Sequence, residues 1–232
     1  MNDAAIPPGV TTAEARALQQ RLADRVVLRN DTGSIAWVAG IDVHYPEKQR
    51  AHAVATLFSY PDLVFTAVAQ ADLPVTFPYV PGLLSFREAP AAVAAVERLP
   101  HRPGLLLCDG QGYAHPRRFG LACHLGVWLD IPAIGAAKSR LIGESDGPPD
   151  EAGAQAPLLD GGEVIGAVVR TKAGVKPLYV SAGHRIDLAA AVRLTLACCR
   201  GYRLPEPNRW AHRLAGGGRA PAGVTVVDAT QC

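Results

Sequence analysis

Two carboxylates in this sequence stand on or directly after short apolar runs. Asp109 follows the run at residues 105–108, and Asp42 lies within residues 35–45, whose β-branched and aromatic side chains favour a strand. A carboxylate in such a place is costly unless a cation, a proton or hydrogen bonds compensate for lost hydration. In α/β sheets, ligands bind at the carboxyl ends of strands. Both residues are therefore site candidates, the structural alternatives being a turn cap at Asp109 and an ion pair at Asp42.

A third carboxylate, Glu88, stands in a different context. The pattern Ser85-x-x-Glu88 is a capping box in front of the helical stretch 91–99, so helix capping is the simplest interpretation of Glu88 alone. Hard divalent cations such as Mg²⁺ prefer oxygen ligands, and they take only a few from the protein. Asp42, Glu88 and Asp109 are the right chemical types to hold one or two such ions.

Six blocks of the sequence, in the same order along the chain, resemble the endonuclease V family of deoxyinosine-directed nucleases. Two residues depart from the family's pattern: Ala182 stands where proline is usual, and His44 where a small polar residue is common. Neither lies at a catalytic position. The resemblance extends over about residues 12–214, and it implies a ribonuclease-H-like α/β fold, a mixed sheet flanked by helices in a single domain. The blocks are residues 40–43, 78–88, 109–120, 135–139, 181–184 and 201–207.

The resemblance also implies a reaction and the residues that perform it. The family hydrolyses the second phosphodiester bond on the 3′ side of deoxyinosine, leaving 5′-phosphate and 3′-hydroxyl ends, and so initiates DNA repair. Asp42 and Asp109 would lie on neighbouring strands and bind Mg²⁺, with Mn²⁺ as a substitute. Glu88 would bind it directly or through water. His212 would position water or the leaving group, and Lys138 would neutralise the scissile phosphate.

Recognition of a deaminated base inside a duplex requires that the base be lifted from the stack. Residues 78–81 suit this task, because two prolines stiffen the backbone and Tyr79 can act as a wedge. The structural alternative is that Tyr79 packs on the core. Ser181 precedes a helix N-terminus, where phosphate contact and helix capping are equally good interpretations. The predicted nucleic-acid contacts are Pro78, Tyr79, Val80, Pro81, Gly82, Leu84, His115, Arg117, Arg118 and Ser181.

Composition sets broad limits on class and compartment. The 232 residues suit one domain, and a formal charge of +2 says little about partners. The five cysteines show no paired metal-ligand spacing, which favours a reducing compartment and argues against zinc. The N-terminus lacks a signal-peptide pattern, and no apolar run is long enough to span a bilayer. These features lead us to expect a cytoplasmic protein without a membrane, and the resemblance adds the expectation of a monomeric enzyme that acts on DNA containing deaminated bases.

The periodicity predicts the elements that position these residues. Strands are expected first as an antiparallel meander and then alternating with helices, which gives a mixed sheet with helices on both faces. Residues 1–10 are expected to be flexible, 144–156 to form a mobile loop, and 215–232 to be a disordered tail that follows the domain at 11–214. Helices are predicted near 12–28, 91–99, 118–129 and 187–199, and strands near 34–45, 51–60, 63–71, 105–108, 133–136, 164–171 and 177–180.

Three other functions remain open at this point. The first is an inosine-directed ribonuclease of the same fold, because sequence physics does not separate RNA from DNA here. The second is a non-catalytic binder of damaged nucleic acid. The presence of Asp42, Glu88 and Asp109 argues against it, because an inactive relative should have lost at least one of these carboxylates. The third is a dinucleotide enzyme, suggested by Gly110 and Gly112, but the third glycine of that motif is missing.

Overall fold

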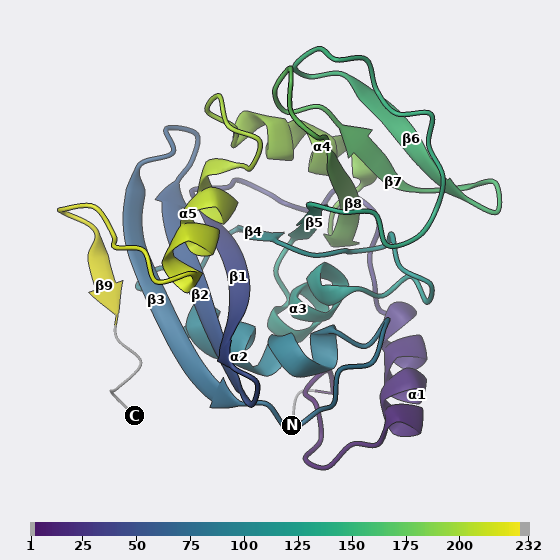
Figure 1. Cartoon of the computed structure of the whole chain (residues 1–232), viewed down its shortest axis with the longest axis vertical. Coiled ribbons are helices and arrows are strands. Elements are labelled where there is room, and N and C mark those ends of the chain that lie inside the picture. The colour runs from purple at the N-terminus through teal and green to yellow at the C-terminus, as the bar shows by residue number, and fades with distance from the viewer. Residues whose placement is uncertain (1–2, 228–232) are drawn as a thin grey trace.

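A mixed sheet of nine strands forms the centre of residues 3–227, the part of the chain that the computed structural model describes (Figure 1). The strand order is β6-β7-β8-β5-β4-β1-β2-β3-β9. Strands β4 and β5 run parallel to β1, whereas β1–β3 and β5–β8–β7–β6 pair antiparallel. The strands are β1 (Trp37–Glu47), β2 (Arg50–Ser59), β3 (Phe65–Pro74), β4 (Leu105–Cys108), β5 (Ala133–Ala137), β6 (Gln155–Asp160), β7 (Glu163–Val169), β8 (Leu178–His184) and β9 (Thr225–Val227).

Helices cover both faces of this sheet, as the sequence predicts. Helices α2 and α3 pack on one face, and α4 and α5 pack on the other, while α1 lies against the α2–α3 layer (Figure 1). None of the described helices is long and apolar enough to cross a membrane. The helices are α1 (Thr12–Ala23), α2 (Ser85–Glu97), α3 (Leu121–Leu129), α4 (Leu188–Ala197) and α5 (Glu206–Ala215).

The alternation of side chains along β1 decides which layer each residue meets. Ala39 and Ile41 are buried in the core beneath α2 and α3, and Val38 is buried in the core beneath α4. Gly40 lies directly under α5. Because successive side chains point to opposite faces, Asp42 shares the face of Gly40 and lies on the α5 side.

Helix α5 packs directly on the backbone of the sheet. A Cβ atom at Gly40 would lie 2.1 Å from the carbonyl carbon of Pro207, so this contact requires glycine. The Thr56 hydroxyl donates to the Pro207 carbonyl (2.9 Å), and the Asn208 side-chain amide donates to the Leu107 carbonyl (3.0 Å). These bonds attach the first turn of α5 to β2 and β4.

Several segments differ from the sequence-based expectation, among them α5 at residues 206–215, where the sequence predicts no helix. Within the expected mobile loop, Glu144 forms an isolated β-bridge with Leu159, and β6 begins at Gln155. The sequence pattern does not predict β6 because the strand contains Pro157, which is tolerated here because β6 is an edge strand. Within the expected disordered tail, β9 pairs parallel with β3, whereas residues 228–232 lie outside the described part. Near the start of the chain, Ala4 is buried and its carbonyl lies 2.9 Å from His124 Nε2.

The close approach at Gly40 gives a stability prediction. In a Gly40→Ala variant the new methyl group meets backbone atoms of Pro207, which have no way to rotate aside, and α5 must move. We expect a loss of at least about 2 kcal/mol in the free energy of unfolding, measured by urea denaturation. Gly104→Ala is the matched control, because its nearest neighbour would lie at 3.6 Å. Equal stability of the two variants would contradict this account of α5 packing.

Candidate active site

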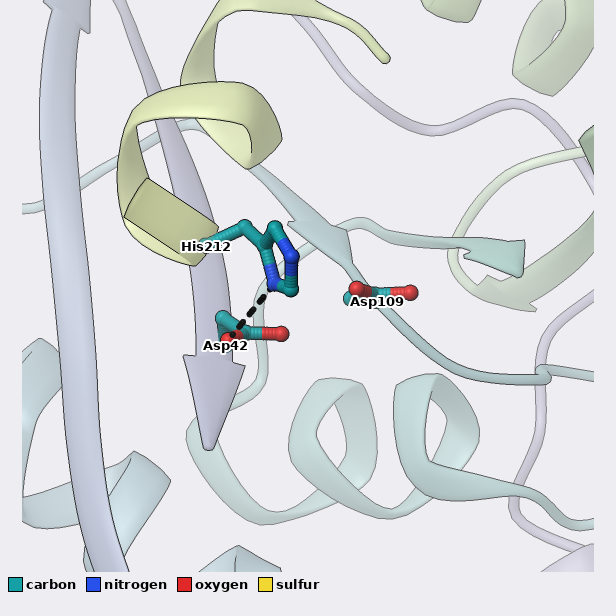
Figure 2. A group of neighbouring side chains, drawn as sticks. All are labelled: Asp42, Asp109 and His212. Carbon is teal, nitrogen blue, oxygen red and sulfur yellow. Dashed lines mark hydrogen bonds and ion pairs between the residues drawn. The ribbon is translucent and has the colours of Figure 1, made fainter. Parts of the chain in front are cut away.

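The two strand carboxylates meet at one edge of the sheet. Asp42 lies on β1, and Asp109 directly follows β4, the parallel neighbour whose Cys108 pairs with Ile41. Figure 2 shows both carboxylates below α5, with the ring of His212 above them. One ligand atom from each of the three residues lies within 4.8 Å of the others. The two carboxylates therefore lie together on neighbouring strands, as the family resemblance implies.

Burial and charge both act on this pair. The pKa of Asp42 is raised from 3.8 to about 6, mainly by burial and then by the negative charge of Asp109. Lys138, which follows β5, opposes this repulsion: its Nζ lies 2.5 Å from Asp109 Oδ2 and 3.1 Å from His212 Nδ1. His212 Nδ1 also lies 3.4 Å from Asp42 Oδ2. Four residues from four separate elements thus form one contact network.

Glu88 approaches the network from the opposite layer. The capping-box interpretation is wrong, since Leu84 is the N-cap of α2 and provides no side-chain cap, while Ser85 Oγ lies 3.0 Å from His124 Nδ1. The Tyr45 hydroxyl donates to the Glu88 carboxylate at 3.3 Å. Burial raises the pKa of Glu88 to about 8, the bond from Tyr45 opposes this, and the charges of Asp42 and Asp109 add to it. Glu88 lies outside the three-residue group.

The donor set fits a hard divalent cation. Two carboxylates and one imidazole supply oxygen and nitrogen ligands in a small space, and their repulsion is relieved by a positive ion between them. Glu88 is buried and close enough for its charge to interact with both aspartates, which suits a role through water. Asp42 and Asp109 are the residues that would hold the ion directly.

A cavity of about 420 Å³ opens beside Asp109. The 79–84 loop forms one wall, and residues 109–111 and 137–141 form the others. Tyr79 stands at the rim with 71% of its surface exposed, so packing of this ring on the core is excluded. Pro78 and Pro81 are also exposed, whereas Val80 packs partly against an apolar cluster. The loop thus presents an aromatic side chain next to a concave space.

Backbone contacts hold this loop in place. The Gly82 carbonyl accepts a bond from Arg117 Nη2 (2.6 Å) and lies 3.0 Å from His115 Nε2, and Gly82 has a φ of +77°, which favours glycine. Gln19 of α1 adds a bond to the same carbonyl at 3.2 Å. Burial lowers the pKa of His115 to about 4, so its ring is neutral at pH 7. Leu84, at the end of the loop, lines the cavity.

Three other predicted contact residues lie in different surroundings. Ser181 is fully buried and accepts a bond from the Gly112 amide (2.9 Å), so the predicted phosphate contact is wrong; the side chain has no access to a ligand. Arg118 pairs with Asp160 (2.9 Å) and Glu163 (2.7 Å) of the β6–β7 hairpin. Contact of Arg117 and Arg118 with a nucleic-acid backbone stays a prediction.

Sequence analysis missed several residues that support the site. Asn208 and Thr56 attach α5, Tyr45 binds Glu88, and Gln19 holds the loop through bonds to Gly82 and Phe119. The sequence gives only a weak indication of the role of Gln19, because it is a polar residue beside the apolar positions of α1. Asn208 and Thr56 carry none, because each bonds a carbonyl that is distant in the sequence.

Comparison with known proteins decides the family. The sequence model of endonuclease V matches residues 20–213, which include all the residues of the contact network and Glu88. The chain belongs to the endonuclease V family. It is 50% identical over 215 residues to the endonuclease V of Roseiflexus sp. (strain RS-1), an alignment that covers 93% of this chain and 96% of the relative.

Solved structures of family members have the same fold. The crystal structure of endonuclease V from Streptomyces avermitilis superimposes with a TM-score of 0.86 at 45% identity, covering 91% of this chain and 95% of that one. The Ciona intestinalis endonuclease V structure has a TM-score of 0.78 at 28% identity, covering 88% and 96%. That relative was crystallised with a 24mer DNA containing an inosine followed by a ribo-adenosine. The family name denotes a nuclease, and the predicted α/β fold is confirmed.

The raised pKa of Asp42 gives a pH-dependent stability prediction for the metal-free protein. A carboxylate whose folded pKa lies above 3.8 contributes stability that is present below about pH 4 and lost as the pH rises through about 6. In EDTA, Asp42→Asn should therefore be more stable than wild type at pH 8, by on the order of 2 kcal/mol, and the difference should vanish near pH 4. Denaturant titration measures both. The exposed Asp146→Asn serves as control, and a pH-independent difference for Asp42→Asn would refute the prediction.

Proposed function

We propose that this family member is a metal-dependent endonuclease that recognises deoxyinosine in DNA. It hydrolyses the second phosphodiester bond on the 3′ side of the lesion, leaves 5′-phosphate and 3′-hydroxyl ends, and so initiates repair. One observation carries the proposal: the Asp42–Asp109 pair, with His212 and Lys138, lies beside a cavity whose rim bears the exposed Tyr79. A hydrolytic centre and a recognition site thus share one edge of the sheet.

The chain's own residues divide the chemistry between them. Asp42 and Asp109 would hold Mg²⁺ or Mn²⁺, and Glu88 would contact it through water. Such an ion supplies a more acidic water and stabilises charge on the phosphoryl and leaving oxygens. The Nζ atom of Lys138 lies 2.5 Å from Asp109 Oδ2. From this position its positive charge would also neutralise the scissile phosphate. His212, whose side chain is 56% exposed, is accessible to substrate and orients the water or the leaving 3′ oxygen.

Recognition is assigned to the loop and the cavity. Tyr79 enters the gap that the lifted base leaves in the stack, and the prolines on either side limit the loop's freedom to yield. The base enters the cavity, where backbone groups of Gly82 and Leu84 contact its edge. A volume of about 420 Å³ lies in the range of small-molecule pockets. Asp109 lines one edge of this cavity, whereas Asp42 and His212 lie outside its lining, so the cut falls one nucleotide away from the lesion.

We further propose a monomeric, cytoplasmic enzyme. The cysteines support the compartment: the four in the described part of the chain are free, and three of them are buried. Burial raises the pKa of each buried thiol, which keeps it protonated and unreactive. Such thiols suit a reducing compartment.

Cleavage of a labelled duplex with one deoxyinosine tests the reaction. With Mg²⁺ or Mn²⁺ we expect one nick, at the second phosphodiester on the 3′ side, which EDTA abolishes and Asp42→Ala slows by roughly a hundredfold or more. An undamaged duplex and an inosine-containing RNA are run in parallel. Binding without cleavage would replace the proposal with a binding function, and faster cleavage of the RNA would replace DNA with RNA as the substrate.

Substitution of Tyr79 tests the wedge. Opening a duplex requires the ring, whereas a single strand has no stack of pairs to open. We therefore expect Tyr79→Ala to slow cleavage of duplex deoxyinosine by about tenfold or more, and that of single-stranded deoxyinosine far less. Tyr79→Phe, which keeps the ring, is the matched control and should retain most activity. Equal losses on both substrates would remove Tyr79 from strand opening.

A further inference from the structure

One row of the sheet carries two histidines and an aspartate on the same face. His44 of β1 lies directly opposite His52 of β2, and His52 lies directly opposite Asp72 of β3. Residues opposite each other in antiparallel strands point to the same side, with Cβ atoms about 4.5–5.5 Å apart. This row is two residues beyond Asp42, at the end of β1 where the pairing with β2 shifts register.

Helix α5 leaves this row uncovered. It covers the preceding row, where Leu214 packs on Val54, the partner of Asp42 in β2. His44 is exposed, and the side chain of His52 is 18% exposed. Within residues 3–227, the side chain of His44 makes no hydrogen bond or ion pair, so its ring is free to turn toward His52.

The ring of His52 is held in a way that suits a metal ligand. Its Nδ1 lies 3.0 Å from Asp72 Oδ1, and because a carboxylate accepts, Nδ1 carries a proton; in the neutral ring Nε2 then presents a lone pair. Metal-ligating histidines commonly donate their second nitrogen to a carboxylate in this manner, which fixes tautomer and orientation. Nε2 of His52 has no other partner in the described part of the chain.

We propose that His44 and His52 form a second divalent-metal site, with Asp72 as the residue that orients His52. Two imidazoles favour a borderline cation such as Zn²⁺, Ni²⁺ or Cu²⁺ over Mg²⁺, and water completes the coordination. The site differs in kind from the Asp42–Asp109 pair, whose carboxylate oxygens suit a hard ion. His44 lies two positions beyond Asp42, which is about 7 Å along β1.

The test must separate this site from the carboxylate pair. We would use an Asp42→Asn/Asp109→Asn background, which removes the oxygen ligands of the first site, and titrate Ni²⁺ by calorimetry. We expect one Ni²⁺ per chain, and an affinity at least tenfold lower when His44→Gln or His52→Gln is added. Asp72→Asn should lower the affinity by about tenfold to a hundredfold, because it releases the ring of His52.

Two controls make the result decisive. His101→Gln removes another histidine, one that stacks on Trp37 at the far end of β1, and should leave Ni²⁺ binding unchanged. Paramagnetic Ni²⁺ should broaden the imidazole NMR signals of His44 and His52 first. The proposal is overturned if the background binds no Ni²⁺, or if binding survives the loss of both histidines. Because the background lacks the carboxylate pair, neither outcome depends on the proposed nuclease function.

Discussion

The repulsion between Asp42 and Asp109 is the interaction on which the site depends. Both carboxylates are mostly buried, and the negative charge of Asp109 raises the cost of ionising Asp42. Adjacent parallel strands fix their separation, so the pair has no freedom to move apart. The stability of the sheet core offsets this electrostatic cost. Two neighbouring groups reduce it, Lys138 after β5 and His212 on α5. A site that is unfavourable when empty is correspondingly favourable for a divalent cation.

Rigid attachment of the surrounding elements keeps this arrangement in place. Helix α5 contacts sheet backbone at Gly40, without an intervening side chain, and polar bonds from Thr56 and Asn208 fix its first turn. One turn after Asn208, His212 reaches Asp42. The loop that carries Tyr79 is fixed by bonds to the Gly82 carbonyl from residues distant in the sequence. An aromatic side chain on a fixed loop loses little conformational entropy when it binds.

Particular residues show how far sequence patterns reach. The positions of Asp42 and Asp109 follow from apolar runs and strand alternation, and both lie where these predict. Glu88 fits a capping box, but its carboxylate accepts a hydrogen bond from the Tyr45 hydroxyl. The local sequence pattern does not encode this contact. Ser181 fits a helix-terminus contact, yet its hydroxyl is buried against Gly112. Strand β6 contains a proline, and β9 has only three residues, too short for periodicity to register.

By itself, the sequence determined most of the strands and the faces on which their side chains point, because local backbone preferences and side-chain alternation depend only on neighbouring residues. The family followed from the resemblance of six sequence blocks. Tertiary structure alone decided which of these residues meet. The separation of Asp42 from His212, of Gln19 from Gly82, or of His44 from His52 and Asp72 is set by how strands pair and helices pack. Those contacts are long-range, and no local pattern encodes the distance between two atoms far apart in the chain.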